Sequence, residues 1–182
     1  MKIIETPFSD LIIIEPRVYE DERGYFFESY NKHKHEENNL NYNFIQDNQS
    51  KSSYGVIRGL HFQLAPYAQT KLIRVLEGTI LDVAVDLRKT SLTFGKVFSV
   101  ELSSENKKQL LIPKGFAHGF SVLSEFAVVF YKCDEFYNKS SEGGIIYNDD
   151  YLNIDWKIEK YAEKVSDKDK LLPLFSNAQN NF

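Results

Sequence analysis

Short extended segments, many of them bounded by glycine turns, fill the middle of this chain and limit what it can fold into. A run of about four to eight apolar, β-branched or aromatic residues between turn residues predicts a strand. Such runs occur at residues 11–14, 23–29, 56–62, 71–76, 80–87, 97–102, 108–112 and 127–133. Short strands punctuated in this way are typical of an antiparallel sandwich or barrel. We therefore predict a mainly β protein.

Length and composition indicate a single folded unit. The chain has 182 residues, of which 42% are hydrophobic and 14% aromatic. A chain of this length usually forms one domain, and no Gly/Ser run, proline-rich tract or internal repeat divides it. We expect residues 1–182 to form one domain. The polar segment 31–43 predicts a short surface helix or loop, and residues 166–169 predict a turn or the start of a helix.

Charge and cysteine usage exclude several classes of protein. The net charge of −4 argues against nucleic acid or an anionic membrane as the main partner, because both require a basic surface. Cys133 is the single cysteine and cannot form an intrachain disulfide. Acidic residues interrupt the apolar runs near the N-terminus, so neither a signal peptide nor a membrane-spanning helix is predicted. We expect a cytoplasmic protein.

Residues 80–87 alternate, with Leu81, Val83 and Val85 on one face and Asp82, Ala84 and Asp86 on the other. If the opposite face packs in the core, these acids point either to water or into a polar cavity. Charges that face water are the commoner case, but both options remain open. Cys133 ends an apolar run and is interpreted as a small buried residue.

Several common enzyme signatures are missing from the sequence. It contains no G-x-G-x-x-G, G-x-x-x-x-G-K-[ST], H-E-x-x-H or G-x-S-x-G pattern, so dinucleotide, P-loop, zincin and hydrolase-elbow sites have no support. His33 and His35 lie two residues apart in the polar segment, and we interpret both as solvated surface side chains.

His61 and His118 are the two informative histidines. His61 ends the run VIRGLH, and His118 follows the turn PKGFA. These patterns resemble the paired motifs of the cupin superfamily, whose first motif normally supplies H-x-H and a downstream glutamate as metal ligands. Here Gln63 replaces the second histidine, and Lys71 falls in the region where the glutamate would be expected. Because zinc or iron requires three or four good ligands, we predict no metal site.

Longer runs make the resemblance more specific. The segments DERGYFFES (21–29), QDNQS (46–50), VIRGLHFQ (56–63), KLIRVLEGTILDVAVDLRK (71–89), SLTFGKVFSVELSSENKKQLLIPKGFAHGF (91–120) and VFYKC (129–133) look like the dTDP-4-dehydrorhamnose 3,5-epimerase family. The match continues through IDW (154–156) and SDKD (166–169). It covers nearly the whole chain, in order and with similar spacing.

The resemblance implies a fold, a partner and a reaction. The fold is a cupin-like jelly roll, an antiparallel double-stranded β-helix with a few short peripheral helices. The working form is a homodimer with exchanged N-terminal strands, and neither a metal nor a redox cofactor is needed. The substrate is a nucleotide sugar, dTDP-4-dehydro-6-deoxy-D-glucose, which is epimerised at C3 and C5 to dTDP-4-dehydro-L-rhamnose for dTDP-L-rhamnose synthesis.

The chemistry of this reaction agrees with the residue types at the matching positions. C3 and C5 both flank the C4 ketone, so removal of either proton gives an enolate. A base is needed on one face of the sugar and a proton donor on the other; imidazole titrates near operating pH, which favours His61 as the base. By resemblance, Asp169 is its carboxylate partner. Tyr131 resembles the proton donor, and Lys71 the cation near the C4 oxygen.

Binding residues carry over in the same way. Side-chain amides in the QDN run can bind base edges, and the guanidinium of Arg58 suits a pyrophosphate. Arg23 and Glu28 are expected to reach the nucleotide in the partner subunit's site. The expected binding residues are Arg23, Glu28, Gln46, Asp47, Asn48, Arg58, His118, Glu142 and Lys168, supported by Asp82, Phe26 and Tyr137.

One segment departs from the family pattern. After the strand that carries the proton donor, the family commonly has a Tyr-Tyr pair and a proline, whereas this chain has Phe136, Tyr137 and then Lys139 at the proline position. Relatives with this fold epimerise one centre only or isomerise the 3,4-keto group. A mono-epimerase, a 3,4-ketoisomerase and a non-catalytic sugar-nucleotide binding barrel therefore remain alternatives. A metal-dependent cupin is a weaker one.

Overall fold

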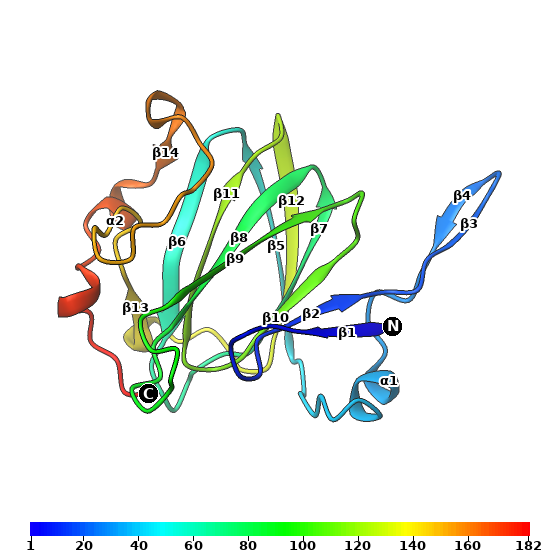
Figure 1. Ribbon diagram of the computed structural model, residues 1–182, viewed down its shortest axis with the longest axis horizontal. Helices are drawn as coiled ribbons and strands as arrows, with labels where there is room; N and C mark the ends of the chain where they lie inside the picture. The colour runs from blue at the N-terminus through cyan, green and yellow to red at the C-terminus, as the bar shows by residue number, and fades with distance from the viewer.

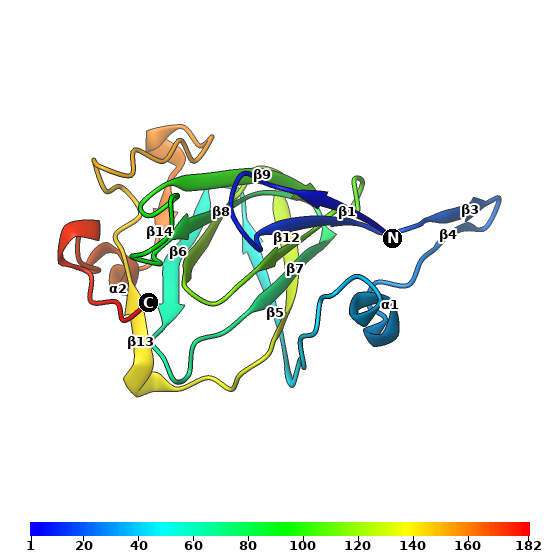
Figure 2. The same cartoon turned by 60° about the horizontal axis from the view of Figure 1, so that its bottom comes forward.

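The computed structural model describes residues 1–182 and consists mainly of two antiparallel sheets packed face to face (Figures 1 and 2). In spatial order, the first sheet contains β1 (Lys2–Glu5), β2 (Ile12–Glu15), β10 (Gln109–Ile112), β7 (Lys71–Glu77), β12 (Phe126–Cys133) and β5 (Gln46–Ser53). The second contains β13 (Glu142–Gly144), β6 (Val56–Gln63), β11 (Phe116–Val122), β8 (Thr79–Asp86) and β9 (Val97–Ser103). The predicted mainly β, antiparallel jelly-roll class is confirmed.

The remaining elements are small. β14 (Lys164–Val165) pairs in parallel with the start of β6, and β3 (Tyr19–Asp21) forms a separate hairpin with β4 (Gly24–Phe26). The two α-helices are α1 (Lys32–Glu36) and α2 (Asp167–Lys170), in the two segments where short helices were expected. Single 3₁₀ turns lie at Lys139–Ser141, Lys160–Ala162 and Phe175–Asn177. No helix of the protein is both long enough and apolar enough to cross a bilayer.

Apolar side chains from alternate strand positions fill the space between the sheets. This core includes Ile73 and Val75 of β7, Ala84 of β8 and Phe120 of β11, all of them buried. Full burial of one such large aliphatic or aromatic side chain stabilises the fold by about 1.5–3 kcal/mol. Tyr131 packs against the edge of this core, so the interior of the sandwich changes from apolar to polar along its length.

The second sheet is covered on its outer face as well. The chain after β13 folds back over it, and Ile145, Leu152 and Trp156 pack there. The indole of Trp156 donates a hydrogen bond to the Tyr147 carbonyl (2.8 Å), and the Trp156 carbonyl accepts one from the Ser121 hydroxyl (2.6 Å). Burial on both faces explains why every residue of β11 is buried. This rigid double layer supports the strands that carry His61 and His118.

Asp82 and Asp86 do not face water, although that was the commoner of the two expected cases. Both side chains are completely buried. Burial alone raises the pKa of Asp86, but hydrogen bonds from Arg88, Thr93 and Ser91 outweigh it and lower the pKa to about 2. Asp86 therefore anchors the turn after β8, whereas Asp82 lies in the polar interior.

His35 contradicts the interpretation of the polar segment as fully solvated. His33 is exposed, but the side chain of His35 is buried, with its ring centroid 4.7 Å from that of Tyr30. Its Nδ1 lies 3.0 Å from the Asn31 carbonyl oxygen. The apolar face of the segment, which includes Tyr42, covers the outer face of the first sheet. His35 is therefore buried although most of its sequence neighbours are polar.

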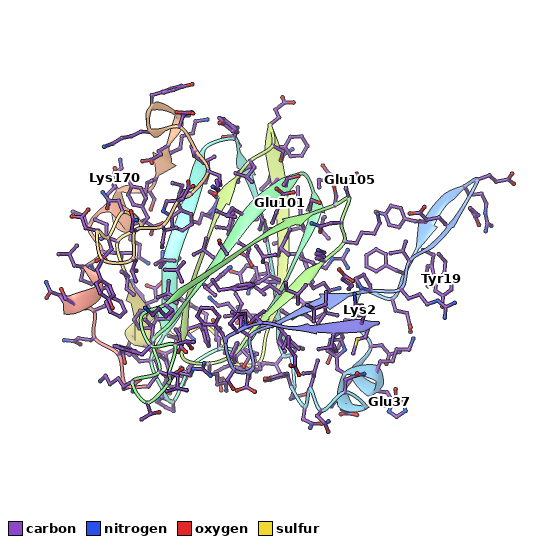
Figure 3. The ribbon with its side chains drawn as sticks, in the orientation of Figure 1. Lys2, Tyr19, Glu37, Glu101, Glu105 and Lys170 are labelled. Atoms are coloured by element: carbon purple, nitrogen blue, oxygen red, sulfur yellow. The ribbon has the colours of Figure 1, made fainter.

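The hairpin formed by β3 and β4 projects away from both sheets (Figures 1 and 2). Figure 3 shows Tyr19 on this arm. The exposed fractions of Tyr19, Tyr25 and Phe26 are 53%, 57% and 67%. Aromatic side chains are rarely placed on an isolated two-stranded ribbon without a surface to cover. The arm therefore leaves three large aromatic side chains more than half exposed in the single chain.

Candidate active site

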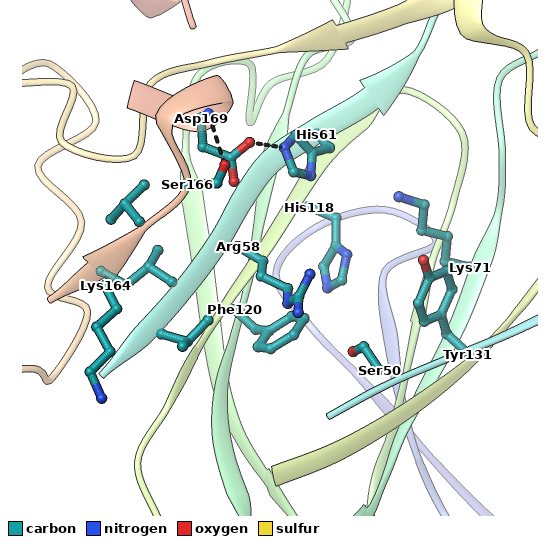
Figure 4. A pocket seen from close by; sticks show the side chains of 13 residues that line it. Ser50, Arg58, His61, Lys71, His118, Phe120, Tyr131, Lys164, Ser166 and Asp169 are labelled. Carbon is teal, nitrogen blue, oxygen red and sulfur yellow. Dashed lines mark hydrogen bonds and ion pairs between the residues drawn. The ribbon is translucent and has the colours of Figure 1, made fainter. Parts of the chain in front are cut away.

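A cavity of about 510 Å³ opens between the two sheets at the polar end of the sandwich (Figure 4). Its wall is formed by β5, β6, β7, β11 and β12 together with the segment that leads into α2. The polar side chains that line it are Ser50, Arg58, His61, Lys71, His118, Tyr131, Lys164, Ser166 and Asp169. All four expected catalytic residues are therefore brought together here.

A β-bulge in β6 aims two site residues at this cavity. His118 of β11 pairs with His61, but Phe120 pairs with Arg58, so two residues of β6 oppose Gly119 alone. Arg58 and His61 lie three positions apart, so regular alternation would turn their side chains to opposite faces of the sheet. The extra residue of the bulge brings both side chains to the same face. Gly59 has φ +122°, and a Cβ on Gly119 would lie 2.7 Å from the Arg58 carbonyl oxygen. The close approach of the strands depends on these glycines.

His61 and Asp169 form a hydrogen-bonded pair on one wall. The distance from Nε2 of His61 to Oδ1 of Asp169 is 2.8 Å. Burial raises the pKa of Asp169, but hydrogen bonds from His61 and from the backbone of Gly59 outweigh this effect and leave the pKa below its ordinary value. An ionised carboxylate can only accept a hydrogen bond, so it favours the neutral tautomer of His61 in which Nε2 carries the proton and Nδ1 the lone pair. Ser166 caps α2 and receives the Asp169 backbone N–H (3.1 Å), which holds the carboxylate in place.

Tyr131 and Lys71 occupy the opposite wall, across the cavity from His61 (Figure 4). They come from neighbouring strands of the first sheet, β12 and β7. Burial raises the pKa of the Tyr131 phenol, so it stays protonated at neutral pH. Burial lowers the pKa of Lys71, while the negative charge of Asp82 acts in the other direction. The cavity thus has an imidazole–carboxylate pair on one wall and a phenol beside a lysine on the other.

His118 forms a second imidazole–carboxylate pair deeper in the sheet. Its Nε2 lies 2.7 Å from Oδ1 of Asp82, and Oδ2 of Asp82 is buried without a hydrogen-bond partner. Both histidines of the cupin-like motifs are therefore engaged by aspartates. Nowhere in the chain does a group of three or more His, Cys, Asp or Glu side chains come together that could hold a metal ion.

Of the expected binding residues, Arg58 and His118 line this cavity, whereas Gln46, Asp47 and Asn48 of β5 do not. Nε of Arg58 donates to the Ser52 hydroxyl (3.0 Å), which points the guanidinium along the cavity wall. On β5, Nε2 of Gln46 donates to Oδ1 of Asn48 (3.1 Å), whereas Asp47 faces outward and pairs with Lys132 (2.9 Å). The side chain of Asp47 thus lies on the opposite face of β5 from those of Gln46 and Asn48.

Glu142 and Lys168 pair at the rim of a neighbouring cavity that also touches His61. Their side chains lie 2.8 Å apart. Lys168 lowers the pKa of Glu142 by its hydrogen bond, and Tyr137 contributes to the same shift. Tyr137 is therefore near the rim, with its ring more than half exposed.

None of Arg23, Phe26 and Glu28 lines the cavity of its own chain. Arg23 is on the projecting arm, where its guanidinium pairs with Asp21. Glu28 follows the arm and pairs with Lys34 and Asn31. The structure of one chain does not bring these residues to the site. Their expected role depends on a second subunit.

Several lining residues escaped the sequence analysis. Ser50, Phe120, Lys164 and Ser166 all line the cavity. The run QDNQSKSS that forms β5 has no apolar residue, so it gave no strand signal. In the structure its even-numbered residues are turned inward. The charged residues Asp47 and Lys51 both fall on outward positions, and this spacing is the sequence signal that could have identified Ser50 as an inward residue. Nothing about the isolated Lys164 in the sequence marks it as a lining residue.

The chain matches known proteins along nearly its whole length. The family model described as dTDP-4-dehydrorhamnose 3,5-epimerase matches residues 5–177. The Shigella flexneri dTDP-4-dehydrorhamnose 3,5-epimerase is 52% identical over 170 residues, which cover 93% of each chain. The crystal structure of the enzyme of this name from Elizabethkingia anophelis is 58% identical, has a TM-score of 0.93 and covers 97% of each chain.

A further solved structure contains a sugar nucleotide. It is the Legionella pneumophila dTDP-6-deoxy-D-glucose-3,5-epimerase in complex with dTDP-4-keto-L-rhamnose, which is 47% identical, with a TM-score of 0.92 and coverage of 97% of this chain and 93% of that one. Identity at this level over this share of the chain extends the agreement from the fold to the family. The chain belongs to the dTDP-4-dehydrorhamnose 3,5-epimerase family.

Proposed function

We propose that this protein epimerises dTDP-4-dehydro-6-deoxy-D-glucose at C3 and C5 to give dTDP-4-dehydro-L-rhamnose, as a step of dTDP-L-rhamnose biosynthesis in the cytoplasm. The observation that carries the proposal is the placement of the His61–Asp169 pair opposite Tyr131 and Lys71 across one cavity. Inversion of a carbon next to a ketone needs a base and an acid on opposite faces. A site for binding alone does not require this arrangement.

Each inversion follows from the charges of these four side chains. Nδ1 of His61 takes the proton from the carbon, and the electron pair of the C–H bond moves to the C4 oxygen. Asp169 stabilises the resulting imidazolium through Nε2, and the ammonium of Lys71 stabilises the enolate oxygen. The phenol of Tyr131 then delivers a proton to the opposite face of the carbon, and the ketone reforms. Each inversion leaves His61 with an extra proton and Tyr131 as a phenolate, so His61 releases a proton to water and Tyr131 takes one up before the next step. Because C3 and C5 both flank C4, the same groups can then serve both centres.

The nucleotide end of the substrate is assigned to polar residues around the cavity. Arg58 suits the diphosphate, because a guanidinium pairs with two phosphate oxygens at once. Amide groups of Gln46 and Asn48 suit the edge of the base. His118, held by Asp82, and the Glu142–Lys168 pair lie on the sugar side, beside the catalytic residues.

The decisive measurement is incubation with dTDP-4-dehydro-6-deoxy-D-glucose in D₂O, followed by mass spectrometry and NMR of the sugar. We expect deuterium at both C3 and C5, with inversion at both. Label at one carbon only would contradict the double epimerisation and indicate a mono-epimerase, with the altered segment 134–139 as the first place to look. Absence of label would contradict epimerase activity on this substrate and leave the binding-barrel alternative.

We further propose a homodimer in which each arm completes the partner's site. The exposed aromatic side chains of β3 and β4 support this arrangement, and so does the absence of Arg23 and Glu28 from the lining of their own cavity. The two subunits exchange the same segment, as closed two-fold symmetry requires. Light scattering of the purified protein should then give twice the chain mass of 21.2 kDa.

A mixing experiment tests the exchange directly. We expect Arg23→Ala and His61→Asn to be poorly active alone at low substrate concentration. In a mixed dimer one site contains a wild-type His61 and the partner's wild-type Arg23, so statistical co-refolding of the two variants should restore about one quarter of the wild-type sites. If each arm serves its own chain, or no chain, mixing restores nothing.

A further inference from the structure

Glutamine side chains hold the loop between β12 and β13, residues 134–138, by its backbone. Gln63 makes two of these four bonds and also ties the loop to the backbone of Tyr67. Its Nε2 donates to the carbonyl oxygens of Tyr67 (2.6 Å) and Phe136 (3.2 Å), and its Oε1 accepts the backbone N–H of Asn138 (2.7 Å). The side chain of Gln63 is buried, with 5% of the residue exposed. A side-chain amide is the group that can both donate twice and accept in this way.

Two further glutamines complete the attachment. Oε1 of Gln46 accepts the backbone N–H of Tyr137 (3.1 Å), and Nε2 of Gln69 donates to the carbonyl oxygen of Glu135 (2.8 Å). Each residue from 135 to 138 is thus bonded through its backbone to a glutamine side chain. Since a loop of this kind has no ladder of its own, these side chains take the place of strand pairing.

The three glutamines lie directly beside the site. Gln63 is two residues beyond His61, Gln69 two before Lys71, and Gln46 two before Asn48. Residues two apart in an extended chain share a face, so the glutamines form the next layer of the same interior surface. In addition, Gln63 is the register partner of Glu142 in β13. A displacement of the loop therefore acts at the edge of the cavity.

The loop also connects the two catalytic walls. It starts at the end of β12, which carries Tyr131, and leads to β13, whose Gly144 pairs with His61. It carries Tyr137, which lies close enough to Glu142 to add to the lowering of its pKa by Lys168. The exposed ring of Tyr137 therefore has a fixed backbone and a polar neighbour at the rim.

We propose that Gln63 is a positioning residue that fixes residues 134–138, and through them Tyr137, in the place where the nucleotide sugar binds. This inference rests on the proposed function for its ligand. Gln63 itself does not line the main cavity, and its side-chain amide bonds to backbone atoms of Tyr67, Phe136 and Asn138. It acts through the loop, so its loss weakens substrate binding and leaves proton transfer by His61 and Tyr131 in place.

The first test compares Gln63→Leu with Gln49→Leu, the same substitution at an exposed residue of β5. We expect Gln63→Leu to raise KM for the sugar nucleotide about tenfold while kcat changes less than about threefold. Hydrogen exchange of the amides of residues 137 and 138 should become faster in this variant. Gln49→Leu should change none of these quantities. Should Gln63→Leu fail to fold, Gln63→Asn keeps the amide donors and acceptor but shortens their reach, and we expect it to raise KM by a smaller factor.

A double-mutant cycle separates positioning from a loss of stability. If Gln63 acts through Tyr137, the KM of Gln63→Leu/Tyr137→Ala should equal that of Tyr137→Ala alone. Multiplicative effects of the two substitutions, or a lower Tm with unchanged KM, would overturn the inference. Turnover by the wild-type protein is measured first, because its absence counts against the proposed function. If the wild type turns over and the Gln63 variants have an unchanged KM, the result counts against the positioning role alone.

Discussion

Replacement of His61 with Asn should lower kcat for epimerisation by about 10²–10⁴-fold, the usual contribution of a positioned general base. Asparagine retains a polar side chain of similar reach but has no basic nitrogen. His61 is half-exposed in the cavity, so we expect its loss to change Tm little. The rate of product formation and the rate of deuterium incorporation at C3 and C5, both measured in stopped assays, should fall by the same factor, because both processes require proton removal.

Asp169→Asn refines this prediction. The amide of asparagine can donate to Nε2 of His61, which would place the imidazole proton on Nδ1 and remove the lone pair from the cavity. We expect a large loss of kcat although the hydrogen-bonded geometry of the pair is retained. The control is His33→Asn, at a histidine that is exposed on α1 and outside the cavity. Full turnover in His61→Asn would remove His61 from the mechanism.

The sequence predicts most of the apolar strands, but it misses the polar strand β5 and also β11, a fully buried strand whose residues were interpreted only as following a turn. The core strands β6, β7, β8, β9, β10 and β12 all overlap predicted runs, because their side chains alternate or are continuously apolar. β5 was not predicted, since its inward residues, among them Ser50 of the cavity wall, carry amides and hydroxyls in place of apolar groups. A strand that serves a polar site lacks the signal on which strand prediction depends.

The site shows the same division. The residues themselves could be assigned from motifs, but their orientation could not. The β-bulge opposite Gly119 turns both Arg58 and His61 toward the cavity. Nothing in the sequence of β6 indicates that the strand contains an extra residue at this point. His35 is buried for a related reason, because tertiary packing against Tyr30 overrides a polar neighbourhood.

The acid role of Tyr131 gives the second large effect, and Tyr131→Phe tests it with the smallest possible change. Phenylalanine keeps the ring that packs at the edge of the core between the sheets and removes only the hydroxyl. We expect net inversion to fall by about 10²–10⁴-fold. Tyr161→Phe serves as the control, because the side chain of Tyr161 is 90% exposed and outside the cavity.

The informative readout is the difference between exchange and inversion. With His61 intact, the variant can still remove a proton, form the enolate beside Lys71 and return a deuteron to the same face from the imidazolium. Deuterium should therefore enter C3 and C5 of recovered substrate with retention of configuration, while product does not accumulate. Burial raises the pKa of the Tyr131 phenol, so in the wild type the donor remains protonated from acid pH to well above neutral. Loss of exchange together with turnover would show that the hydroxyl acts before reprotonation, for example in forming the enolate, and would contradict a role limited to donating the second proton.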